Sequence, residues 1–141
     1  MRLWHYKLIP YLPKDMLVSQ WRECIAIKRQ WEKGTLKHRL VSYVMNYDKE
    51  YFYNYVDFVI KQLKHKNIKF KYVYYYEIKD FCNPSHYLSG RHYKEHNNRY
   101  LKQCYYNLQE KVDRGIITQE EWEKVKSCPD LYDIDIDDGI V

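Results

Sequence analysis

The 141-residue sequence has little glycine and proline and no long apolar run. Only four Gly and four Pro occur, which excludes collagen-like chains and Gly/Pro-rich low-complexity chains. No stretch approaches the roughly 20 apolar residues that a membrane helix needs, and residues 1–7 lack the apolar stretch of a signal peptide. Apolar residues make up 45% of the chain and aromatic residues 18%, enough to build a core, so disorder is excluded as the main state. We therefore expect an intracellular globular protein without membrane association.

Recognisable metal, redox and cofactor motifs are also missing. The four cysteines form no C-x-x-C pair, and free, buried or half-buried thiols are a better interpretation than two disulfides. His92 and His96 are four residues apart on an expected helix, but no third metal ligand lies near them, and no H-E-x-x-H pair occurs. The chain has no glycine-rich phosphate loop and no serine nucleophile elbow. We predict no metal and no cofactor.

The charge is unevenly distributed. Residues 129–141 hold five Asp and no Lys or Arg, which leaves 24 basic and 14 acidic residues in the remainder and a net charge of +10 there. A domain with this excess attracts polyanions, most commonly nucleic acid, although a generally basic protein has the same composition. We expect one domain over residues 1–128 and a flexible acidic tail over 129–141, which could fold against the basic face and compete with DNA.

Hydrophobic spacing predicts a mainly α fold, a single compact domain of about four to five helices. Gly34 and Gly115 are expected helix stops, and Thr118 with Glu121 forms a capping box at the start of the last helix. The expected helices cover residues 14–31, 35–45, 48–66, 91–114 and 118–126.

The segment KFKYVYYYEIKD, residues 69–80, alternates at first and then becomes aromatic. We interpret it as a short extended segment, either a strand or irregular. Lys69, Lys71 and the tyrosines at 72–76 could stack on unpaired bases while neutralising phosphates, but packing of these tyrosines into the core is the favoured interpretation. Asn83-Pro84-Ser85 and Ser89-Gly90 indicate turns.

The first helix carries the most informative local pattern. Arg22 and Arg29 are seven residues apart and point the same way, opposite Cys24 and Trp31. Glu23 lies at the margin of the apolar arc, where a carboxylate is partly desolvated and close to cations, and this combination suits a group that transfers protons. An ordinary amphipathic helix whose glutamate meets water or an arginine is favoured on the pattern alone.

The N-terminus is a second candidate reactive group. Arg2 is too bulky for the usual removal of the initiator methionine, so we expect Met1 to keep a free α-amine. An α-amine has a typical pKa of about 7.7–8.0, against about 10.4 for lysine, and a useful fraction is therefore an uncharged nucleophile near neutral pH. Such an amine can attack a sugar C1′ or an aldehyde and form an imine. This chemistry requires the terminus to lie beside a catalytic acid.

Three stretches resemble the pyrimidine-dimer DNA glycosylase family. They are MRLWH followed by LIPYLP at 8–13, QWREC at 20–24, and GTLKHRLV at 34–41 with the helix that follows, and together they cover about the first 70 residues. The resemblance implies a compact, mostly helical protein whose N-terminal amine attacks C1′ of the damaged nucleotide. It also implies a glutamate on the first long helix that assists glycosyl cleavage and β-elimination. These roles fall on Met1 and Glu23, and Arg22 and Arg2 match arginines that contact DNA.

We therefore predict a DNA-repair glycosylase with AP-lyase activity, acting as a monomer on double-stranded DNA with damaged pyrimidines, in the cytoplasm or nucleoid; a viral gene is one expected source. A non-catalytic DNA-binding protein and a glycosylase or lyase for another modified or abasic site remain alternatives. The expected DNA contacts are Arg2, Arg22, Lys28, Arg29, His38, Arg91, Lys94 and Lys102. Arg91, Lys94 and Lys102 share a face of the helix expected over 91–114, and an ordinary solvated helix surface explains this pattern equally well.

Overall fold

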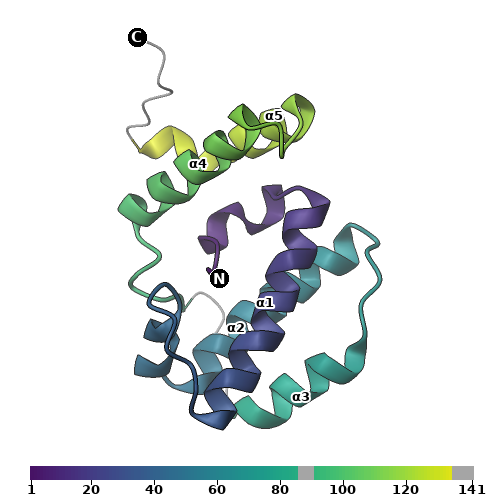
Figure 1. The fold of residues 1–141 in the computed structure, drawn as a ribbon, viewed down its shortest axis with the longest axis vertical. Helices are drawn as coiled ribbons and strands as arrows, with labels where there is room; N and C mark the ends of the chain where they lie inside the picture. The colour runs from purple at the N-terminus through teal and green to yellow at the C-terminus, as the bar shows by residue number, and fades with distance from the viewer. Residues whose placement is uncertain (86–90, 135–141) are drawn as a thin grey trace. The chain divides into compact units, whose positions relative to one another are not determined.

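Helices form nearly all the regular structure in the computed structural model, which describes residues 1–85 and 91–134 (Figure 1). No β-strand occurs in these ranges, so the predicted mainly α class is confirmed. The chain divides into a first unit, residues 1–3 and 15–93, and a second unit, residues 4–14 and 94–141. The expected turn at Ser89-Gly90 and the tail residues 135–141 lie outside the described residues.

The core of the first unit is built mainly by α1 (Lys14–Lys33) and α2 (Lys49–His65), close to the predicted bounds. Gly34 ends α1 with φ +73°, a left-handed conformation that glycine adopts without a Cβ penalty. Both helices bury apolar residues at helical spacing, as their sequences predict. The fully buried ones include Leu17, Cys24, Ile27, Phe52, Val56 and Val59.

The helix predicted over residues 35–45 is wrong. The structure has only a short 3₁₀ helix there, η2 (Ser42–Asn46). The amide of Thr35 donates to the carbonyl of Gln30 and closes the end of α1, and the carbonyl of His38 accepts from the amides of Val41 and Ser42 in a tight turn. The buried residues of the segment, Leu36, Val41 and Val44, lack the regular spacing that an α-helix needs to bury one face.

The extended segment predicted around residues 69–80 is also wrong, because residues 72–82 form helix α3 (Tyr72–Cys82), which packs against α2. Ile78 and Cys82, four residues apart, are buried on one face of it. Tyr72 and Tyr76 have the same spacing on an exposed face, with 46% and 56% of their surface accessible. The prediction that these tyrosines pack into the core is therefore wrong for Tyr72 and Tyr76.

In the second unit, α4 (Asn98–Asp113) begins seven residues later than predicted. Asn97 is its N-cap, and the side-chain oxygen of Asn97 accepts from the amide of Tyr100 at 2.9 Å. Arg91 and Lys94 precede this helix, so the prediction that they share a helix face with Lys102 is wrong. The helical placement of residues 92 and 96 is wrong for the same reason.

The rest of the second unit agrees better with the sequence. The capping box of Thr118 and Glu121 is present at the start of α5 (Gln119–Lys126), as predicted. The 3₁₀ helix η1 (Tyr6–Tyr11) is held by two buried histidines: Nδ1 of His5 accepts from the amide of Lys7, and Nδ1 of His96 accepts from the amide of Tyr6. These imidazoles are therefore hydrogen-bond acceptors that support the backbone of η1.

Part of the expected acidic tail has regular structure. Residues Pro129–Asp133 form the 3₁₀ helix η3, and a carboxylate oxygen of Asp130 lies 3.7 Å from Nζ of Lys7 on η1. No helix in the described part of the chain combines the length and apolar character needed to cross a membrane.

Candidate active site

The backbone at the N-terminus is bonded to the glutamate of α1. The amide of Arg2 donates to Oε2 of Glu23 at 3.0 Å, and Figure 1 shows the first residues beside α1. Three covalent bonds join the nitrogens of residues 1 and 2, so the Met1 α-amine lies within about 7 Å of the same carboxylate oxygen. Both Met1 and Glu23 are half-buried. The backbone nitrogen of Met1 and the Glu23 carboxylate are therefore neighbours at a half-buried position.

A buried glutamine fixes this arrangement from the preceding turn of α1. Gln20 is 1% exposed, and its Nε2 donates to the carbonyl of Arg2 at 2.9 Å and to Oε2 of Glu23 at 3.4 Å. The hydroxyl of Tyr55 on α2 donates to Oε1 of Gln20 at 3.0 Å. The amide side of Arg2 is thus bound by Glu23 and its carbonyl side by Gln20, which restricts rotation of the first peptides relative to the carboxylate.

The two oxygens of the Glu23 carboxylate have different surroundings. Both hydrogen bonds described above use Oε2, and no hydrogen bond to Oε1 is present within residues 1–85 and 91–134. One oxygen therefore orients the group, while the other remains open to exchange a proton with a bound molecule.

The cysteine next to Glu23 is not a competing nucleophile. Burial raises the pKa of the Cys24 thiol far above its ordinary value, and the negative charge of Glu23 raises it further. All four cysteines are free and buried, as predicted. The protonated thiol is weakly reactive, so the amine and the carboxylate are the groups of this region that fit nucleophilic and proton-transfer chemistry.

The arginines of α1 lie on its exposed side, as the helical spacing predicts. Arg22 is adjacent to Glu23, and Arg29 is two turns further along, with its guanidinium 5.3 Å from the ring centre of Tyr74. Lys28 is not on this side: it is 8% exposed, and Nζ lies 3.3 Å from a carboxylate oxygen of Glu32. A DNA contact by Lys28 would require this ion pair to open.

The remaining predicted DNA contacts are scattered. His38 is exposed in the loop after α1, where its Nδ1 accepts from the amide of Leu40. Arg91 is exposed in the first unit, and its carbonyl accepts from the side chain of Asn54. Lys94 and Lys102 belong to the second unit. Of all the predicted site residues, the structure brings Met1, Arg2, Arg22 and Glu23 together.

Sequence reasoning missed two residues that support the site. Gln20 stands within the apolar stripe of α1, and a polar residue at such a place, three positions before a candidate acid, is a signal that could have identified it. Tyr55 is 35 positions away from Gln20, and no local pattern connects them.

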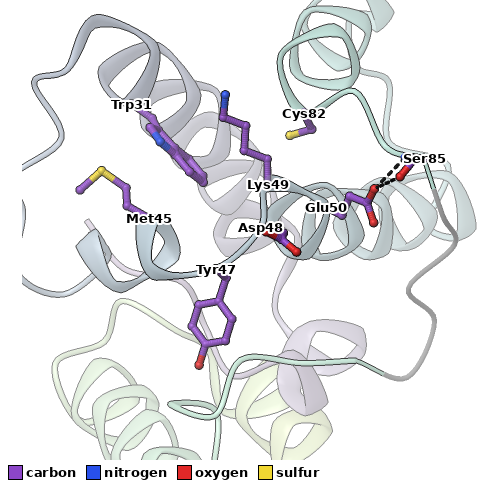
Figure 2. A pocket seen from close by; sticks show the side chains of 8 residues that line it. All are labelled: Trp31, Met45, Tyr47, Asp48, Lys49, Glu50, Cys82 and Ser85. Atoms are coloured by element: carbon purple, nitrogen blue, oxygen red, sulfur yellow. Dashed lines mark hydrogen bonds between the residues drawn. The ribbon is translucent and has the colours of Figure 1, made fainter.

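An open pocket of about 620 Å³ lies elsewhere in the first unit, near the end of α1 and the start of α2 (Figure 2). Lys49 extends between Trp31 and Cys82, while Glu50 accepts hydrogen bonds from the amide and hydroxyl of Ser85. Trp31 is eight residues beyond Glu23, about 12 Å along the helix axis. The pocket is therefore separate from the region of the amine and carboxylate. Met45, Tyr47 and Asp48 complete its lining.

One comparison with known proteins gives a match. The family model described as pyrimidine dimer DNA glycosylase matches residues 1–75, just over half of the chain. No curated protein and no solved structure gives a match. The matched residues include Met1, Arg2, Gln20, Glu23 and Tyr55, so the hydrogen-bonded arrangement at the N-terminus lies entirely within the matched region.

Proposed function

Because the chain belongs to the pyrimidine dimer DNA glycosylase family, we propose that it removes damaged pyrimidines through an imine on its N-terminal amine and then cleaves the strand as an AP lyase. The observation that carries the proposal is the 3.0 Å hydrogen bond from the Arg2 amide to Glu23. This bond holds the α-amine of Met1 near a carboxylate with one open oxygen. Family membership supports glycosylase activity on DNA, and the geometry supports the assignment of roles.

The first step is base removal. The uncharged Met1 nitrogen attacks C1′ of the damaged nucleotide, and the bond between C1′ and the base breaks, with its electron pair and a proton going to the base. The nitrogen gives up its two protons in turn: the first accounts for the proton on the base, and the second passes to O4′ when the ring C1′–O4′ bond opens and the C1′=N imine forms. We assign these proton transfers to Oε1 of Glu23, because Oε2 is occupied by Arg2 and Gln20.

The second step is strand cleavage. Glu23 removes a proton from C2′ of the imine, a double bond forms between C2′ and C3′, and the C3′–O3′ bond breaks with its electron pair leaving on the phosphate. Water then hydrolyses the imine, which releases an unsaturated aldehyde at the 3′ end and regenerates the Met1 amine. Every atom and proton in this sequence is supplied by the protein, the DNA or water.

DNA binding precedes both steps. The exposed Arg22 and Arg29 lie on one side of α1 and are suited to phosphate contacts around the lesion. Extruding a nucleotide costs a few kcal/mol and costs least at a damaged site, which contributes to selectivity. We propose that the extruded sugar is presented to Met1 and Glu23 while the arginines hold the flanking backbone.

Borohydride trapping tests the proposal. Reduction during incubation with abasic duplex DNA should give a covalent adduct that peptide mapping assigns to Met1. A matched control extends the chain by one residue before Met1, which moves the amine by up to about 3.5 Å and should sharply reduce trapping. A mapped adduct on a lysine, or no adduct at all, would contradict the mechanism.

Lesion choice is tested separately, by comparing cleavage of UV-irradiated, abasic and alkylated duplexes. We expect cleavage of the irradiated and abasic duplexes, since the first contains the pyrimidine dimers of the family description and the second enters the reaction after base removal. Cleavage of the abasic duplex alone would restrict the activity to that of a lyase. Salt-dependent binding without any cleavage would identify a non-catalytic DNA-binding protein instead.

A further inference from the structure

We infer that the exposed side of α3 is a binding surface for unstacked bases of single-stranded DNA. This surface, the tyrosine face, consists of Phe70, Tyr72 and Tyr76 with the neighbouring Lys64. The inference rests on the proposed function, because it takes DNA as the ligand. It assigns a role to residues that the proposed chemistry does not use.

The aromatic rings of the tyrosine face form a row. The ring centres of Phe70 and Tyr72 are 4.6 Å apart, and those of Tyr72 and Tyr76 are 6.3 Å apart. The two tyrosines are 46% and 56% exposed, and Val73 between them is 54% exposed. Aromatic side chains clustered on a surface in this way are typical of interaction sites, because water otherwise covers their apolar faces.

The row is anchored to the protein at both ends. Phe70 packs edge-on against Trp21 of α1, with ring centres 6.0 Å apart. Tyr76 contacts the ring of Tyr75, whose hydroxyl is hydrogen-bonded to that of Tyr53 on α2 at 2.7 Å. The exposed rings are therefore presented by packed neighbours, and stacking a base on them requires little ordering.

The charges around the tyrosine face match a polyanion. Residues 58–76 contain no Asp or Glu, and Nζ of Lys64 lies 5.5 Å from the ring centre of Tyr72. A surface of aromatic rings among lysines is how proteins bind single-stranded nucleic acid, because bases stack on the rings while the cations neutralise phosphates. A protein partner would meet no charge complementarity unless its own surface were acidic. The lysines in this stretch are Lys61, Lys64, Lys66, Lys69 and Lys71. Lys61 is paired with Asp57, with Nζ 3.0 Å from a carboxylate oxygen, and the acidic residues of α3, Glu77 and Asp80, follow Tyr76. The excess of positive charge therefore comes from the other four lysines.

The tyrosine face also lies in the same unit as the proposed reactive groups. Trp21, which packs against Phe70, is two residues before Glu23 on α1. Residues two positions apart on a helix point to nearly opposite sides of it, so a strand opened at the lesion contacts both regions by passing round α1. We assign the tyrosine face to bases of the opened strand and Met1 and Glu23 to the reacting sugar.

The test measures binding of a single-stranded oligonucleotide of about 12 residues that carries the fluorescent base 2-aminopurine. The Tyr72→Ala/Tyr76→Ala double variant should bind it about tenfold or more weakly and lose most of the fluorescence change, because each stacked base contributes substantially to affinity. The Tyr72→Phe/Tyr76→Phe double variant keeps both rings and should bind like the wild type. Tyr132→Ala, which removes a 78% exposed tyrosine of the second unit, is the matched control and should have no effect.

The inference would be overturned if the alanine variant bound the oligonucleotide with the affinity of the wild type. It would also be overturned if the phenylalanine variant lost as much affinity as the alanine variant, because this would indicate hydrogen bonding by the hydroxyls rather than stacking on the rings. Circular dichroism and melting temperature check that the variants fold. Borohydride trapping of the alanine variant on saturating abasic DNA separates the two proposals. If the alanine variant is trapped on abasic DNA and binds the oligonucleotide as the wild type does, only the role of the tyrosine face is refuted. If the alanine variant binds the oligonucleotide more weakly and neither it nor the wild type forms a trapped adduct, only the imine mechanism is refuted.

Discussion

The two units of the chain differ in charge. The first unit has 15 Lys and Arg against 8 Asp and Glu, a net charge of +7, while the second has 9 against 11, a net charge of −2. The net charge of +5 for the whole chain hides this contrast. Met1, Glu23, Arg22 and the tyrosine face all belong to the positive unit. Attraction of DNA and the proposed chemistry are therefore expected to reside in the same part of the protein.

The units also differ in what their buried polar groups do. In the first unit, Gln20 and Tyr55 hold the backbone of Arg2 against a candidate acid. In the second unit, the buried His5 and His96 accept hydrogen bonds from backbone amides of η1. Buried polar side chains thus position the backbone of Arg2 beside Glu23 in one unit and stabilise a short helix in the other. Variants in the two units should accordingly separate activity from stability.

The largest effect is expected for Glu23→Gln. The amide oxygen of glutamine can still accept from Arg2, so the geometry is retained while proton transfer is lost. Cleavage of abasic duplex DNA should fall about 10²–10⁴-fold, with DNA affinity changed little. Gel-based cleavage rates and fluorescence anisotropy measure the two quantities. Asp15→Asn, at an exposed position of the same helix, is the control, and unchanged cleavage by Glu23→Gln would remove Glu23 from the mechanism.

Alkaline pH should destabilise the first unit through its buried thiols. Burial raises the pKa of Cys24 far above 9.0 and that of Cys82 from 9.0 to about 12. In the unfolded chain these thiols ionise above about pH 9, whereas in the folded chain they stay protonated. The stabilisation is therefore complete below pH 9 and is lost as the pH rises toward 12, by about 1.4 kcal/mol per pH unit for each thiol.

Urea unfolding at pH 8 and pH 10 measures this loss. Trp21 and Trp31 report on the first unit, and Trp4 and Trp122 report on the second, so variants that retain one pair of tryptophans distinguish the units. Cys24→Ala should reduce the decrease in unfolding free energy between the two pH values. An equal decrease with and without this thiol would show that another group causes the alkaline destabilisation.

A smaller effect is expected for Tyr55→Phe, which removes the donor to Oε1 of Gln20. Leaving that buried oxygen without this bond should cost about 1–3 kcal/mol of unfolding free energy. Cleavage should also slow several-fold, because the peptide of Arg2 is held less firmly. Tyr53→Phe is a matched control on the same helix, since it removes the hydroxyl bond to Tyr75 and should lower stability without slowing cleavage. Equal cleavage rates in the two variants would contradict a positioning role for Tyr55.

The sequence predicts those parts of the fold that depend on local repetition. Helices α1 and α5 are predicted by apolar spacing with a glycine stop or a capping box, and α2 is predicted by apolar spacing alone. The place of Glu23 at the edge of the apolar arc predicts its half-buried side chain but not its partners. Helix α3 is not predicted by the sequence, because its run of aromatic residues has no clear hydrophobic period. Packing against α2 determines the conformation of this segment instead. The beginning of α4 is set by the cap at Asn97, which apolar spacing alone does not locate.

The supporting contacts of the site could not be predicted for a different reason. The bond between Tyr55 and Gln20 joins residues 35 positions apart, and that between Arg2 and Glu23 spans 21 positions. Periodicity within one helix specifies which face is buried but not which residue of another segment meets it. The resemblance to a family indicated that the terminus and the glutamate act together, and the structure gives the hydrogen bonds that bring them together.

The smallest expected effect tests the charge contrast between the units directly. If DNA binds the positive unit, Arg22→Gln should weaken duplex binding uniformly across sequences and reduce the slope of log affinity against log salt by about 1, the value for one lost phosphate contact. Lys124→Gln removes one exposed charge from α5 of the negative unit and should leave that slope unchanged. Anisotropy titrations over a range of salt concentrations give both slopes. Because the two variants lose the same net charge, equal slopes would mean that DNA responds only to the total charge of the protein, and the contrast between the units would then have no role in binding.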